Sequence, residues 1–229
     1  MKAKGNVMAR RPIWHDEYWL LLIKIFLKQP QGVKRLYSKD LIDVAMELNL
    51  PPAFLHQKMM QLRRIDTPRL QRIWDSYANN PRKLARGIKL LRQMNGFGTA
   101  GAFYKDVREV DTWQNDFKPI VTTGPATPDE ARLTPVMLIM ILDLYFRLTP
   151  ITMVPQTPEI IALAKLIHTT PEQIAAVMEV YRVCDPYIKG EEFIVSPLLS
   201  PCMAIWKRFG NEDPDKLAAL AAQLKDYWE

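Results

Sequence analysis

The chain has 229 residues, of which 48% are hydrophobic and 24% are charged, with a net charge of +6. This balance excludes a disordered chain and a fibrous repeat, and the length suits one large or two small globular domains. Only two cysteines are present, Cys184 and Cys202, too few for a disulfide framework, so we expect a reducing compartment and a cytoplasmic location.

Neither the N-terminal segment nor the most apolar runs of the chain indicate a membrane protein. Residues 1–11 are basic but lack the apolar core of a signal peptide. The most apolar runs, 18–27 and 136–148, contain charged residues and are shorter than the roughly 20 apolar residues of a membrane-spanning helix. We therefore expect both runs to be buried helices of a protein without a membrane partner.

The sequence contains an internal repeat. A shift of 119 residues aligns 18–66 with 137–185 in one apolar register, and the match resumes after an insertion near 189–200. The register pairs Leu21, Leu22, Ile25 and Phe26 with Met140, Ile141, Leu144 and Tyr145, and Leu55, Met59 and Leu62 with Ile174, Met178 and Tyr181. A repeated period of this kind indicates two copies of one helical unit.

Prolines mark where the helices of each copy begin. Eighteen prolines against nine glycines favour helices joined by short turns, and Pro52, Pro81, Pro171 and Pro214 stand where a helix can start without losing a hydrogen bond. We expect helices near 16–28, 39–48, 52–64 and 82–94, with a segment around Trp74 before the last, and near 134–148, 158–167, 171–183, 201–210 and 214–227. The only strand candidate is 192–196.

These elements predict an all-α protein made of two tandem related helical domains. The expected N-terminal repeat spans 12–95 and is basic, a hairpin and linker follow at 96–133, and the C-terminal repeat spans 134–229 and is acidic. Each repeat contains a short helix pair with the spacing of a helix-turn-helix motif.

The second helix of the first pair offers hydrogen-bond donors. Leu55, Met59 and Leu62 recur at helical spacing and should face the core. The residues then left toward solvent are His56, Gln57, Lys58, Gln61, Arg63 and Arg64, which suit phosphates and base edges. The alternative interpretation is that the helix pair is only a common packing unit. The equivalent helix of the second copy carries Glu172 and Glu179, which DNA would repel.

The helix pair also resembles a known module. The stretch LIDVAMELNLPPAFLHQKMMQLRRIDTP, echoed by IIALAKLIHTTPEQIAAVMEVYRVCDP, is similar to the helical module that precedes the nuclease domain in many bacterial HNH endonucleases. The resemblance implies engagement of DNA. It does not imply cleavage, because the paired histidines and the asparagine of an HNH metal site are absent. The whole chain also resembles a bacterial family of two-repeat helical proteins.

A glycine motif follows the last helix of the first repeat. Leu91, Met94, Gly96, Phe97, Gly98 and Ala102 resemble the helix-hairpin-helix pattern, in which glycines bring backbone N–H groups, here with Thr99 beside them, against phosphate. Asn95 replaces the usual proline of that pattern. The alternative is a glycine that only ends a helix.

Charge differs between the two halves. Residues 1–115 hold 21 basic and 10 acidic side chains, a net charge of +11, and the remainder holds 10 and 15, a net charge of −5. The helix at 82–94 carries its basic side chains on one arc, opposite Leu84, Ile88, Leu91 and Met94. The second repeat has Asp215, Ala219 and Ala222 where the first has Arg82, Arg86 and Lys89.

The pattern gives little support for catalysis. His15, His56 and His168 are far apart, and no histidine or cysteine pair has metal-ligand spacing. No P-loop and no nucleophile elbow occur. We expect no enzymatic activity, no cofactor and no metal.

The sequence therefore predicts a non-enzymatic protein whose basic N-terminal repeat contacts the phosphate backbone of nucleic acid, with DNA favoured over RNA. The alternatives are a protein–protein interaction scaffold and a regulatory subunit of a DNA-processing complex. The C-terminal repeat could hold a protein partner or form a homodimer. The predicted contact residues are Arg82, Lys83, Arg86, Lys89, Arg92, Gly96, Gly98, Thr99, His56, Gln57, Lys58, Arg63 and Arg64.

Overall fold

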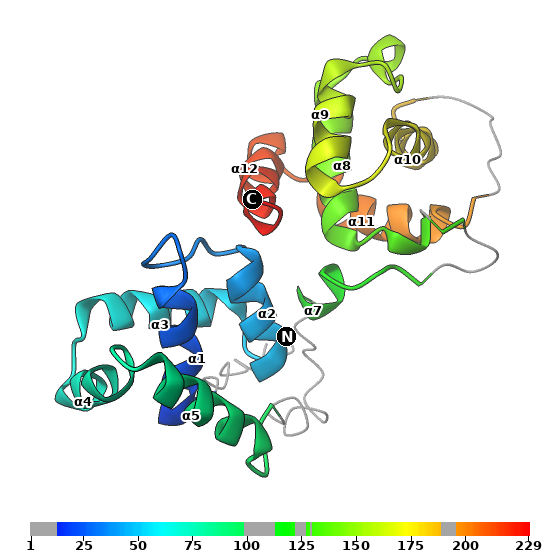
Figure 1. Cartoon of the computed structure of the whole chain (residues 1–229). Helices are drawn as coiled ribbons and strands as arrows, with labels where there is room; N and C mark the ends of the chain where they lie inside the picture. The colour runs from blue at the N-terminus through cyan, green and yellow to red at the C-terminus, as the bar shows by residue number, and fades with distance from the viewer. Residues whose placement is uncertain (1–12, 99–112, 122–126, 129, 189–195) are drawn as a thin grey trace, which may run out of the picture. The chain divides into compact units, whose positions relative to one another are not determined.

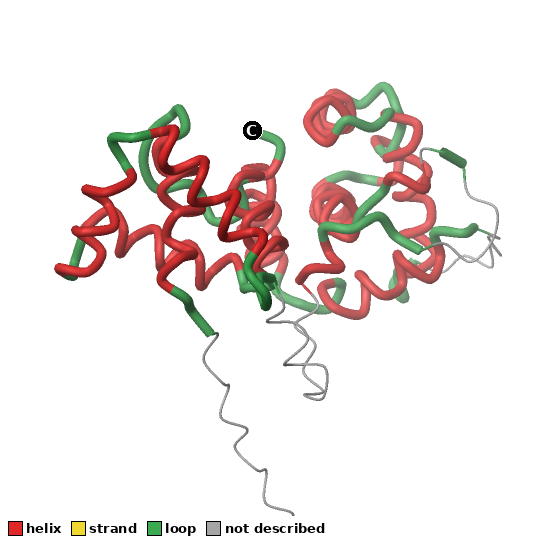
Figure 2. Tube along the Cα trace, turned by 60° about the horizontal axis from the view of Figure 1, so that its bottom comes forward, coloured by secondary structure: helices red, strands yellow, loops and turns green. Residues whose placement is uncertain are grey.

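The computed structural model describes residues 13–98, 113–121, 127–128, 130–188 and 196–229. In these ranges the regular elements are all helices and no strand occurs, which confirms the predicted all-α class (Figures 1 and 2). The chain divides into two compact units, with 1–36 and 40–110 in unit 1 and 37–39 and 111–229 in unit 2. No helix in the described ranges is both long enough and apolar enough to cross a membrane.

Figure 1 labels the helices in chain order, and within each half several of them follow one another after only three or four residues. Those of the first half are α1 (Trp19–Leu27), α2 (Lys39–Leu48), α3 (Pro52–Arg64), α4 (Pro68–Tyr77) and α5 (Pro81–Gln93). Those of the second half are α7 (Trp113–Asp116), α8 (Pro135–Arg147), α9 (Pro158–Ile167), α10 (Pro171–Cys184), α11 (Leu199–Phe209) and α12 (Pro214–Leu224). Short 3-10 turns adjoin α1, α8 and α12.

The helix bounds repeat with the same 119-residue shift as the sequence. Helix α9 begins and ends 119 residues after α2, and α10 begins 119 residues after α3. The turn is repeated as well: Asn49 and His168 both have left-handed backbones, with φ of 52° and 56°. In each case the next amide bonds back to an alanine carbonyl five residues earlier, Leu50 to Ala45 at 3.1 Å and Thr169 to Ala164 at 3.0 Å. This is the Schellman way of ending a helix.

One apolar helix lies at the centre of each unit. Helix α1 is buried over most of its length and packs against α3, α4 and α5. Helix α8 is buried in the same way and packs against the corresponding helices α10, α11 and α12. A helix that is hydrophobic on all sides has to be surrounded by others. The two units therefore share their central helix and its three packing partners.

Prolines begin many of the helices, as the sequence predicts, and polar side chains cap several of them. Proline is the first residue of seven of the eleven described α-helices, including those that start at Pro52, Pro81, Pro171 and Pro214. Side chains that accept a hydrogen bond from the first turn belong to Thr67, Asn80, Thr134, Thr170 and Asp213. Such caps satisfy backbone N–H groups that have no partner inside the helix.

Three details differ from the sequence prediction. The segment around Trp74 is a full helix, α4. The last predicted helix ends at Leu224, and Lys225–Tyr227 form a 3-10 turn. Of the strand candidate at 192–196, residues 192–195 lie outside the described residues.

Candidate nucleic-acid interface

Helix α5 is held rigidly on one side. Asn80 caps it by accepting a hydrogen bond from the Lys83 amide at 2.9 Å. Leu84, Ile88 and Leu91 are buried against the core of unit 1. Gly87 lies close to its neighbours, because a Cβ built there would stand 3.1 Å from a methyl carbon of Leu20. Burial of this face fixes which residues of α5 point outward.

Three basic side chains form the outward stripe of α5. Arg82, Arg86 and Lys89 are all exposed, and their spacing of four and three residues puts them on one side of the helix. None of the three makes a hydrogen bond, ion pair or ring contact with any residue that the structure describes. We call these three residues the α5 stripe.

The two other predicted cations of α5 are already engaged. The Lys83 Nζ lies 4.8 Å from the centre of the Tyr77 ring, a cation–π contact. Arg92 donates two hydrogen bonds to the Glu47 carboxylate, from Nε at 2.5 Å and from Nη2 at 3.0 Å. These hydrogen bonds raise the pKa of the Arg92 guanidinium. A phosphate would have to compete with Glu47 for Arg92.

The glycine motif after α5 packs against the end of α2. Gly96 and Gly98 have positive φ values of 88° and 69°. A Cβ at Gly98 would lie 2.8 Å from the Glu47 carbonyl oxygen, and the Asn49 side-chain amide donates to the Gly98 carbonyl. Packing alone therefore requires glycine at 98. Thr99 and Ala102, which complete the predicted hairpin, lie outside the described residues.

The prediction that Met94 belongs to the buried face of the last helix is wrong, since Met94 is 53% exposed. Helix α5 ends at Gln93, and Met94 has an extended backbone with ψ of 138°. The helical register that puts Leu84, Ile88 and Leu91 on one side therefore stops one residue before Met94.

The predicted residues of α3 divide into two groups. Gln57, Arg63 and Arg64 are exposed, as expected, whereas His56 is half-buried. Lys58 is half-buried too, and its Nζ lies between 5.1 and 5.5 Å from the ring centres of Trp14, Trp19 and Phe54. An ammonium held over three rings has aromatic partners in place of water. The prediction that Lys58 is a solvent-facing cation therefore needs this correction.

The sequence interpretation missed Lys24. This residue is exposed on the otherwise buried α1, beside a groove described below. A signal was present, because Lys24 interrupts an apolar run and its equivalent at a shift of 119 is Asp143, of opposite charge.

The chemistry available at these surfaces is ionic. Among the described residues no three histidine, cysteine or acidic side chains gather as a metal site. The interface candidates are guanidinium and ammonium groups on one face of a helix, and such groups form charge-assisted hydrogen bonds with anions. Comparisons with protein-family models, curated proteins and solved structures found no match to this chain.

Proposed function

We propose that unit 1 binds the phosphate backbone of DNA through the α5 stripe and does no chemistry on it. One observation carries the proposal: the stripe consists of three exposed cations without partners among the described residues, and its counterpart on α12 consists of Asp215, Ala219 and Ala222. The buried faces of the two helices match, at Leu84 and Leu217 and at Leu91 and Leu224. Packing therefore gives no reason for the charge.

The dimensions of the stripe suit a charged polymer. Arg82 and Lys89 are seven residues apart, which corresponds to about 10 Å along a helix. Duplex DNA carries roughly six phosphate charges over that length. Contacts to phosphate carry no sequence information, so the binding should be salt-dependent and only weakly selective.

The other predicted contacts are ranked by their surroundings. Arg63 and Arg64 are exposed at the end of α3 and add two further cations to the surface of unit 1. Arg92 and Lys58 are secondary, because Glu47 and three aromatic rings already hold them. The resemblance of each repeat to a module of DNA endonucleases favours DNA over RNA as the polymer.

Fluorescence anisotropy with labelled duplex and single-stranded DNA over a salt series tests the proposal. The test variant is Arg82→Glu with Arg86→Glu, and the matched control is Lys207→Glu with Lys216→Glu, which makes the same charge change at exposed positions of unit 2. We expect the test variant to bind at least about tenfold more weakly and to lower the salt slope by about two. The control should stay close to the unmodified protein.

Two results would contradict DNA binding through the α5 stripe. One is no binding of either DNA at about 50 mM salt, where backbone contacts are strong. The other is an equal loss of affinity in the test variant and the control, which would mean that overall charge alone matters. Tight binding of one duplex sequence and not of another would also exclude a backbone-only mode.

A further inference from the structure

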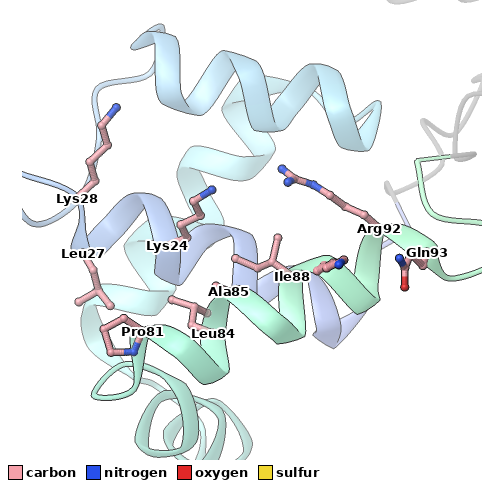
Figure 3. Close-up of a pocket in the computed structure, with 10 residues that line it drawn as sticks. Lys24, Leu27, Lys28, Pro81, Leu84, Ala85, Ile88, Arg92 and Gln93 are labelled. Atoms are coloured by element: carbon pink, nitrogen blue, oxygen red, sulfur yellow. The ribbon is translucent and has the colours of Figure 1, made fainter.

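A groove lies between α1 and α5 (Figure 3), and Arg86 is not among the residues that line it. Its volume is about 580 Å³. Apolar side chains of both helices form its floor, among them Leu27, Leu84 and Ile88. Four cations line it as well: Lys24 from α1, Lys28 directly after α1, and Lys89 and Arg92 from α5. No acidic residue is among its lining. In Figure 3, Lys24, Lys28 and Arg92 extend to the same side of the helix pair.

Unit 2 has a groove at the equivalent place. Its lining includes Asp143, Arg147, Ala221 and Lys225, which stand where the first repeat has Lys24, Lys28, Ile88 and Arg92. There the charges cancel, because Asp143 and Glu159 face two cations, and Arg147 Nη2 lies 2.6 Å from the Asp143 carboxylate. This groove measures about 230 Å³. The groove of unit 2 is thus lined by charges of both signs, whereas the groove of unit 1 is larger and the charged residues of its lining are all cations.

Two of the four cations in the unit 1 groove are already neutralised. Lys28 pairs with Asp40 at 2.7 Å, and Arg92 pairs with Glu47. Both acids belong to α2, so one ion pair lies at each end of that helix. Lys24 and Lys89 have no such partner among the described residues. The groove therefore lacks the carboxylate that Asp143 supplies in unit 2.

We propose that this groove binds an acidic amphipathic helix of a partner protein. The apolar floor would cover leucine-like side chains, and carboxylates beside them would reach Lys24 and Lys89. The lining of α5 runs from Pro81 to Gln93, about 18 Å, which is the length of roughly three helical turns. Between the cations the lining includes the apolar side chains of Leu27 and Ala85, which are not buried in the core. A nucleic acid backbone has no apolar face to pack against them, so the floor argues for a protein helix.

A designed peptide can serve as the probe. It is a capped, fluorescein-labelled peptide of about 18 residues, long enough to form an isolated helix, with leucines at i, i+4 and i+7 and glutamates beside them. Its control has every glutamate replaced by glutamine. Anisotropy should detect binding of the acidic peptide to the full chain, and binding of the glutamine peptide should be at least about tenfold weaker.

Matched variants locate the binding. Lys24→Glu lies in the groove and Arg86→Glu lies outside it, and both reverse one exposed charge of unit 1. We expect Lys24→Glu to weaken peptide binding about tenfold and Arg86→Glu to change it less than about twofold. Ala85→Leu places a larger side chain in the groove, at an exposed helix position and without a change of charge. It should weaken peptide binding as well.

Three outcomes would overturn the proposal: equal effects of Lys24→Glu and Arg86→Glu, equal binding of the two peptides, or unchanged binding after Ala85→Leu. Circular dichroism of each variant confirms that the helices are intact. Lys89 belongs to both sites, but this test changes Lys24 and Ala85, whereas the test of DNA binding changes Arg82 and Arg86. Either proposal can fail while the other stands.

Discussion

At the level of single residues, Gly98 illustrates how one pattern can have two physical causes. The glycines after α5 resemble a phosphate-binding hairpin, and the left-handed backbone at Gly98 agrees with that pattern. The same glycine is also required because the Glu47 carbonyl oxygen lies where a Cβ would be. Glu47 is about fifty positions earlier in the chain, so only the fold reveals this cause. For that reason the proposed function rests on the α5 stripe.

The two cysteines provide a prediction at the same scale. Burial raises the pKa of the Cys184 thiol to about 11 and raises the pKa of Cys202 further. The thiolate is the reactive form, so an upward shift lowers the reactive fraction at every pH below the shifted value. Both thiols should react with a disulfide reagent at pH 8 at least about tenfold more slowly in the native protein than in guanidinium.

The pH dependence checks the cause of the slow reaction. Between pH 8 and 10 the native rate should rise with pH, because the thiolate of Cys184 is still a small fraction below its raised pKa. In the unfolded protein the rate should level off near the ordinary thiol pKa. Rapid reaction of one thiol in the native protein at pH 8 would contradict this account.

At the level of helices, the hydrophobic period and the prolines predicted where helices begin and end, but not which residues of different helices contact one another. The bounds of α2, α3 and α9 agree with the sequence prediction. Neighbouring residues set these bounds, because prolines begin α3 and α9 and a residue with a left-handed backbone follows each of the three helices. The ion pair of Arg92 with Glu47 joins residues 45 positions apart in the sequence, and the cation–π contact of Lys58 with Trp14 joins residues at a similar sequence separation. Such contacts depend on how helices pack, which a period does not specify. The sequence therefore predicted the basic arc of α5, but not which of its side chains already have a partner in the folded protein.

The pair formed by α5 and α12 allows a gain-of-function prediction. In a chain already carrying Arg82→Glu and Arg86→Glu, the changes Asp215→Arg, Ala219→Arg and Ala222→Lys would put a basic stripe on α12. All three positions are exposed, so the buried face of α12 stays intact. We expect DNA affinity at low salt to be restored at least in part, with a salt slope that increases by about two to three.

The matched control adds the same charge elsewhere in unit 2. Glu179→Lys with Glu212→Lys also raises the net charge by four, at exposed positions of α10 and of the turn before α12. Anisotropy over a salt series compares the two chains in the same background. Equal recovery in both would show that net charge, and not a helical stripe, supports binding.

At the level of the whole molecule, the two units have the same arrangement of helices but differ in the sign of their charge. The net charge of +6 is the difference between a basic first half and an acidic second half. The same contrast occurs in the two grooves, where Lys24 and Asp143 occupy equivalent positions. The central helices α1 and α8 have three corresponding packing partners, so these charge differences occur on one shared arrangement of helices. We infer that the first unit carries the binding and that each unit folds around its own central helix.

Equivalent core variants test this division. Leu22 and Ile141 are 119 residues apart, and both are completely buried on α1 and α8. Each substitution by alanine should destabilise its unit by about 2–5 kcal/mol. Hydrogen exchange measured by mass spectrometry should then show lost protection in α3 and α5 for Leu22→Ala, and in α10 and α12 for Ile141→Ala. DNA affinity should fall only in the first variant. Leu90→Ala, at a leucine that is 58% exposed, is the control and should change neither property. Equal loss of protection in both units from either core variant would contradict the inference that each unit folds around its own helix.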